Sequence, residues 1–97
     1  MILAALGLFL AGAAAAQEPR AADLAGRLGC FACHALRGQG GKVAAPLDGA
    51  ATRLNPEQLE TVLTHPRRLH PGAKMPGYAY LPPEERQALV DFLQNVK

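Results

Sequence analysis

The chain has 97 residues, which is enough for one small domain and too few for two. Ten Lys and Arg against eight Asp and Glu give a formal charge of +2, a slight excess that is not typical of a nucleic-acid-binding protein. The two Cys, three Phe and two Tyr, with no Trp, supply little material for a core. A domain of this kind needs a further source of stability, such as a large buried cofactor.

The N-terminal segment, residues 1–16, carries no charged side chain. Its apolar run ends in four alanines, and polar residues follow at once. This order predicts a secretory signal peptide cut near Ala16, with residues 17–97 as the mature domain. The alternative is a retained membrane anchor, although sixteen helical residues reach only about 24 Å across a hydrocarbon core of about 30 Å. Both place the domain outside the cytoplasm, periplasmic or otherwise exported, and only the second tethers it to a membrane.

The first half of the domain is predicted to hold one helix followed by a loop. Residues 20–29 form a short amphipathic helix, because Leu24 and Leu28 are four residues apart and Gly29 allows a sharp turn at the end. Residues 37–55 are rich in Gly and have no periodicity. We therefore expect a long loop there.

The second half is predicted to hold two helices. One starts with Asn55 as N-cap, Pro56 at the first position and Gln58 completing a capping box, and it runs to about Thr64. Four Pro then make residues 65–82 irregular. The last helix opens at Pro83 and carries an apolar stripe at helical spacing, formed by Ala88, Leu89, Phe92, Leu93 and Val96. Because no segment alternates like a strand, the predicted fold class is all-α, with three to four helices and long loops.

The strongest signal is the pentapeptide Cys30-Phe31-Ala32-Cys33-His34, since Cys-x-x-Cys-His is the attachment sequence of c-type haem. In a helical turn Cys30 and Cys33 share a face, so both thiols can add to the vinyl groups of one porphyrin edge. His34 can then bind the iron. A thioredoxin-like redox pair would need a βαβ setting and a structural zinc site a second pair of ligands, while a chance disulfide is the simplest alternative.

The iron would need a sixth ligand, or it would keep an open position. Met75, His65 and His70 are the candidates, all within one loop. Met75 lies between Lys74 and Pro76, where a core-filling role is less expected, and its soft thioether favours ferrous iron and raises the potential. His70 is the second choice, because His65, beside a proline at a helix end, is expected to cap the helix.

Four segments in chain order make the sequence resemble the small single-haem cytochrome c family over residues 20–97. They are Gly29–His34, Pro46–Gly49, Pro71–Pro76, and Leu81–Arg86 leading into Leu89–Leu93. The resemblance implies a domain wrapped around one covalently attached haem c. It implies that Cys30 and Cys33 attach the haem and that His34 and Met75 ligate the iron.

The resemblance also implies roles for residues around the haem. The backbone carbonyl of Pro46 would accept the Nδ1 proton of His34, since a metal-bound histidine generally needs such a partner. Arg53, Tyr78 and Tyr80 are candidates to bind a haem propionate. The alternative for these three is a solvated arginine and two core tyrosines.

The expected function is single-electron transfer between a donor and an acceptor protein, without substrate turnover. Candidate partners are a quinol-oxidising complex, a terminal oxidase or a dehydrogenase. A second hypothesis is an electron-relay subunit of a membrane or periplasmic oxidoreductase, and a third is catalysis or gas sensing at an iron that Met75 does not bind. Cations expected near the exposed haem edge would steer an acidic partner, namely Arg37, Lys42, Arg67, Arg68 and Lys74.

Overall fold

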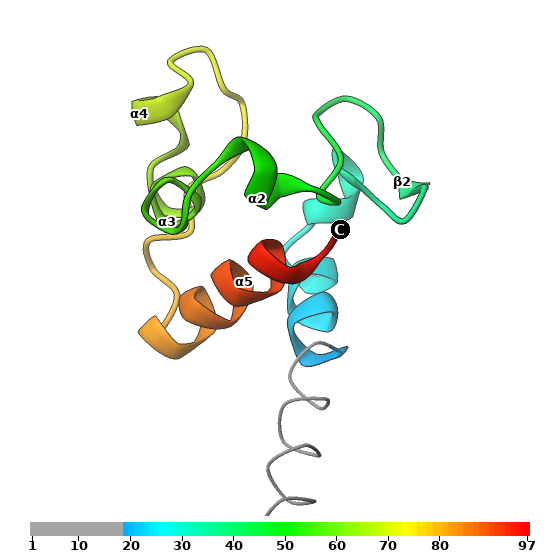
Figure 1. The fold of residues 1–97 in the computed structure, drawn as a ribbon. Coiled ribbons are helices and arrows are strands. Elements are labelled where there is room, and N and C mark those ends of the chain that lie inside the picture. The colour runs from blue at the N-terminus through cyan, green and yellow to red at the C-terminus, as the bar shows by residue number, and fades with distance from the viewer. Residues whose placement is uncertain (1–18) are drawn as a thin grey trace, which may run out of the picture.

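The structure, a computed structural model, describes residues 19–97, so the predicted signal segment 1–16 lies outside the described residues. After helical residues 19–27 come the 3-10 helix η1 (Cys30–Ala32), strands β1 (Ala35–Leu36) and β2 (Gln39–Gly40), and helices α2 (Ala50–Arg53), α3 (Pro56–Thr64), α4 (Pro66–Leu69) and α5 (Pro83–Asn95) (Figure 1). The predicted all-α fold class is confirmed. Among residues 19–97 no helix combines the length and the apolar character needed to cross a membrane.

Helix α3 begins and ends where its capping signals place it. The backbone N–H of Gln58 donates to Asn55 Oδ1 at 2.8 Å, and Gln58 Oε1 accepts from the N–H of Asn55 at 2.9 Å, which completes the predicted capping box. Leu59 and Leu63, four residues apart, are both buried. Because His65 is the C-cap of α3 and Pro66 starts α4, the chain turns sharply at this point.

The core joins helices from both ends of the chain. Leu89, Phe92 and Leu93 on α5 belong to one buried cluster with Ala21 and Ala25 of the first helix. The two alanines are 3% and 2% exposed, so their small side chains sit fully inside the core. At the end of α5 the carbonyl of Val96 accepts a hydrogen bond from Gly49 N at 3.0 Å. The C-terminus thereby lies against the long loop, as Figure 1 shows.

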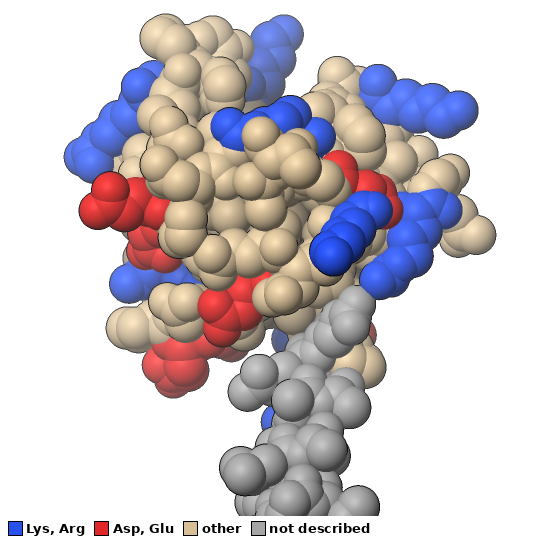
Figure 2. Space-filling model, viewed as in Figure 1, with Lys and Arg blue, Asp and Glu red and all other residues tan. Residues whose placement is uncertain are grey.

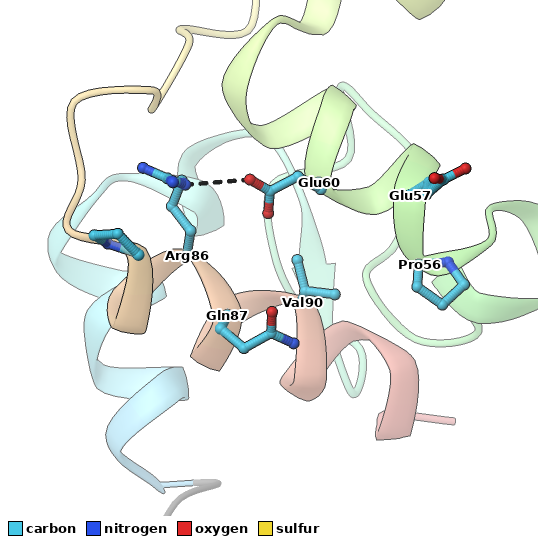
Figure 3. A pocket seen from close by; sticks show the side chains of 7 residues that line it. Pro56, Glu57, Glu60, Arg86, Gln87 and Val90 are labelled. Atoms are coloured by element: carbon cyan, nitrogen blue, oxygen red, sulfur yellow. Dashed lines mark hydrogen bonds and ion pairs between the residues drawn. The ribbon is translucent and has the colours of Figure 1, made fainter.

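Arg86 connects α5 to α3 and to the segment before α5. Its Nε lies 3.2 Å from Glu60 Oε1 at the cleft between the two helices (Figure 3). Its Nη1 donates to the carbonyls of Leu81 at 2.6 Å and Ala79 at 3.3 Å. Arg86 therefore holds the C-terminal end of the segment that leads from residue 75 into α5.

Candidate functional site

The cysteine pentapeptide folds into one tight turn. Gly29, with φ 86°, ends the first helix in the left-handed region, and η1 follows directly. The N–H groups of Cys33 and His34 both donate to the carbonyl of Cys30, at 3.3 and 3.0 Å. Cys30 begins this 3-10 helix and Cys33 is its C-cap, so both cysteines belong to the same turn.

The two thiols are not joined in a disulfide. Cys30 is half-buried and Cys33 is exposed. Burial raises the pKa of the Cys30 thiol, and a backbone hydrogen bond offsets part of this rise. Both cysteines of the turn are therefore free thiols, as thioether formation requires.

A small hairpin holds the turn from outside. Strands β1 and β2 pair antiparallel around Arg37 (φ 50°) and Gly38 (φ 81°). The chain beyond β2 then donates from Gly41 N to the carbonyl of Phe31 at 2.9 Å, and from Ala44 N to that of Cys33 at 3.0 Å. The long loop thus supplies partners for backbone groups that the short helix η1 leaves unpaired.

The His34 ring is oriented by a backbone carbonyl. Its Nδ1 lies 2.6 Å from the carbonyl oxygen of Ala45. Since a carbonyl only accepts, Nδ1 carries the hydrogen, and Nε2 is the ring nitrogen left to bind a metal. The prediction that Pro46 provides this acceptor is wrong by one residue. The backbone N–H of Leu47 donates to Ala35 O at 2.9 Å, which aligns residues 45–47 with β1. The carbonyl of Ala45 consequently faces the imidazole of His34.

The carbonyl of Pro46 is used by Arg53 instead. Arg53 Nη2 donates to it at 2.6 Å, and Nη1 lies 3.5 Å from the carbonyl of Asp48. The carboxylate of Asp48 in turn accepts from the N–H of Arg37, at 2.9 and 3.1 Å. Arg53 and Asp48 therefore hold the segment that carries the acceptor of His34. A propionate contact for Arg53 and a haem contact for Pro46 stay predictions.

Met75 lies in a segment that is anchored on α3. Its side chain is half-buried and packs against the core. Two residues later, a Cβ on Gly77 would lie 2.7 Å from the carbonyl oxygen of Thr64, and Tyr78 N donates to the carbonyl of Leu63 at 2.7 Å. The rival ligand His65 is the C-cap of α3, as expected, and its Nδ1 lies 3.0 Å from Thr64 Oγ1.

Partly buried apolar side chains border the core, and side chains of this kind can cover a large flat apolar group. Several apolar residues pack on the core with one side still exposed: Ala22, Leu28, Cys30, Phe31, Leu36, Leu47, Leu54 and Met75. They come from the first helix, the attachment turn, the hairpin and the loops on either side. The described part of the chain contains no group of three or more His, Cys, Asp and Glu that could hold a metal ion.

Comparison with known proteins found a match to a family model. The family model described as cytochrome c oxidase, cbb3-type, subunit III matches residues 16–93. The chain belongs to this family of c-type cytochromes. It is accordingly a haem c electron-transfer protein. Searches of the curated proteins and of the solved structures found no match.

Tyr78 links the two halves of the cytochrome around the attachment turn. Its hydroxyl donates to the carbonyl of Leu28 at 2.9 Å, across fifty positions of sequence, and the residue is 6% exposed. Burial raises the pKa of this hydroxyl, and the charges that Cys30, Tyr80 and Cys33 carry when ionised raise it further. Its proton is thus committed to a structural bond. A propionate contact for Tyr78 stays a prediction, and its neighbour Tyr80 is 73% exposed.

Removing this hydroxyl tests its contribution. We expect Tyr78→Phe to lower the free energy of unfolding of the haem-loaded cytochrome by about 1–2 kcal/mol, because the carbonyl of Leu28 loses its donor in a poorly hydrated position. Guanidinium unfolding followed by circular dichroism measures the change. The control is Tyr80→Phe, at an exposed position. Equal stability of the two variants would show that the bond between Tyr78 and Leu28 contributes nothing.

The sequence analysis does not predict the roles of three residues of the site, namely Ala45, Asp48 and Gly41. Ala45 acts through its backbone carbonyl, which any residue could provide. Asp48 has a recognisable signal, since an Asp before Gly is typical of a turn, but the turn that it stabilises lies eleven residues earlier. Gly41 is one of a Gly-Gly pair, a pattern that indicates close backbone approach.

Proposed function

We propose that this cytochrome carries one haem c, attached through Cys30 and Cys33 and ligated by His34 and Met75, and that it passes single electrons between redox proteins outside the cytoplasm. The carrying observation is the arrangement of the pentapeptide: both thiols project from one turn, and Nδ1 of His34 is engaged 2.6 Å from Ala45 O. When bound, the haem supplies reversible one-electron chemistry.

Each protein group has a defined task in this proposal. The carbonyl of Ala45 fixes the His34 tautomer and makes Nε2 a stronger ligand. The Met75 thioether favours the reduced state and raises the reduction potential. The half-buried apolar side chains, Phe31 and Leu47 among them, exclude water, so a change of charge at the iron reorders few solvent dipoles.

The charge distribution supports an acidic partner. Helix α5 carries three acidic residues and one Arg, whereas the segment from residue 37 to residue 74 carries six Lys and Arg and three Asp and Glu. On the face in Figure 2, most cations lie around the upper and right-hand parts, and most acids lie at the lower left, over α3 and α5. Lys42, Arg68 and Lys74 are exposed and can steer such a partner. Electron-transfer rates that do not depend on ionic strength would contradict this part.

A second candidate function follows from the matched family. Its description names an oxidase subunit, so the cytochrome is a candidate electron-relay subunit of a terminal oxidase or another membrane oxidoreductase. In this case it would act within a stable complex, and a retained N-terminal anchor would favour it. The free carrier and the subunit use the same haem site. They differ in whether the cytochrome purifies alone or with a complex.

The test is expression of the full chain in a host with haem-attachment machinery. We expect a pyridine haemochrome spectrum typical of two thioether bonds and a mass with one added haem. Cys33→Ser should shift that spectrum, because one vinyl group then stays unsaturated. A protein that lacks covalent haem would overturn the proposal. The same mass locates the N-terminus: loss of residues 1–16 indicates a cleaved signal, and the whole chain in the membrane fraction indicates an anchor.

A further inference from the structure

Arg67 binds the backbone of the segment that contains Met75. Arg67 lies in α4, whose first residue, Pro66, is one of the largest fully buried side chains. Its Nη1 donates to the carbonyl oxygens of Ala73 at 3.3 Å and Met75 at 3.1 Å. One guanidinium nitrogen thus bridges the two carbonyls that bracket Lys74. This places Arg67 in a different role from the partner-steering charge that the sequence suggested.

The ends of the segment are fixed by other contacts. At the start, Ala73 N donates to the carbonyl of His70 at 2.8 Å. At the finish, Gly77 lies against the carbonyl of Thr64, and Tyr78 N donates to that of Leu63 at 2.7 Å. Arg67 acts between these two anchors, on the backbone of Met75 itself. Arg67 thus contacts the backbone from which the Met75 side chain extends.

The contact suits the rigid guanidinium of an arginine. A guanidinium is planar and rigid, and its N–H donors keep fixed directions, whereas an ammonium on a flexible stem does not. The side chain is exposed, so its loss is expected to cost little overall stability. Arg68, the next residue, is also exposed and has no hydrogen bond or ion pair from its side chain to the described residues 19–97. It is therefore a matched control with the same charge.

We propose that Arg67 is a positioning residue for Met75. By holding the Met75 carbonyl it directs the thioether toward the iron that His34 binds, and it slows the exchange of this weak ligand for others. The inference rests on the proposed function, because it requires Met75 to be the axial ligand. Arg67 acts through Met75 and does not itself touch the iron.

The test uses the haem-loaded cytochrome and its Arg67→Gln, Arg67→Lys and Arg68→Gln variants. Three quantities are measured on each: the red-region band of ferric iron bound to methionine sulfur, the affinity of the ferric protein for added imidazole, and the thermal unfolding curve. We expect Arg67→Gln to weaken the band and to bind imidazole about fivefold more tightly, which is the effect of about one lost hydrogen bond. Arg67→Lys should fall between this variant and the wild type. Arg68→Gln should match the wild type in the band and the affinity.

The outcomes separate this proposal from the one on which it rests. A wild-type protein without the red-region band would overturn both, because Met75 would not be the ligand. A normal band in the wild type, with equal imidazole affinity in Arg67→Gln and Arg68→Gln, would overturn only the role of Arg67. A large drop in unfolding temperature of Arg67→Gln with an unchanged band and affinity would assign Arg67 to general stability and would also refute it.

Discussion

Replacing Met75 with alanine is expected to lower the reduction potential of the haem-loaded cytochrome by on the order of hundreds of millivolts, within the span of about 0.8 V that axial ligands set. The thioether stabilises ferrous iron, and an alanine methyl group cannot replace it. The ferric spectrum should lose its red-region methionine band and become high-spin. Spectroelectrochemical titration measures the potential and the spin state on the same sample.

Two further variants serve as controls for Met75→Ala. His70→Ala and His65→Ala remove the rival ligands, and both should keep the methionine band and the wild-type potential. His65 already packs its Nδ1 3.0 Å from Thr64 Oγ1, and His70 is exposed in the turn before Ala73. If Met75→Ala keeps the low-spin state and the wild-type potential, while His70→Ala loses the low-spin state and changes the potential, the ligand is His70. The third hypothesis, an open iron, would instead show a high-spin wild type.

Gly41→Ala is expected to lower the free energy of unfolding strongly, by about 3 kcal/mol, and to reduce the yield of haem-loaded protein. A Cβ at position 41 would lie 2.7 Å from the carbonyl carbon of Ala32 and 2.9 Å from the Cα of Cys33, and it would lie closer still to the carbonyl oxygen of Ala32. All three atoms belong to the backbone of the attachment turn. They can move only if the turn itself moves, so the cysteine thiols would be displaced as well.

The control for this variant is Gly72→Ala. A Cβ at position 72 meets nothing within 4 Å, and the residue does not have a positive φ, so the substitution should leave stability and haem yield nearly unchanged. Denaturant unfolding and the ratio of haem to protein absorbance measure both effects. Similar values for the two variants would show that the hairpin does not press on the attachment turn as tightly as the distances indicate.

The sequence predicts best where a local signal is strong. The capping box at Asn55 and Gln58 locates α3 to within a residue, and the apolar stripe through Leu89 and Phe92 locates α5. The pentapeptide predicts a c-type cytochrome, which the family match confirms. In each case the information lies in side chains a few residues apart, whose spacing has a direct physical meaning.

The sequence predicts poorly where backbone groups or long-range contacts decide the structure. Helices α2 and α4 have four residues each, too few for a periodic pattern, so both regions look like loops. The predicted acceptor for His34, Pro46, differs by one residue from the observed acceptor, Ala45, because a backbone carbonyl carries no side-chain signature. Arg67 looks like a surface charge, since nothing in its neighbours shows that its guanidinium turns back to residues 73 and 75.

The hydrogen bond from Tyr78 to Leu28 has a consequence for the thermodynamics of folding. It joins residues fifty positions apart, and closing a flexible loop of that length costs roughly 3.5 kcal/mol of chain entropy before any constant term. A single hydrogen bond returns only about 1 kcal/mol, so it cannot close this loop by itself. A haem joined to the chain at Cys30 and held by Met75, as proposed, would close nearly the same loop. Attachment of the cofactor would thus supply the reduction in chain entropy on which the tertiary contacts of the second half of the chain depend. The apo and holo chains should therefore differ most in the stability of the segment from α4 to Tyr78.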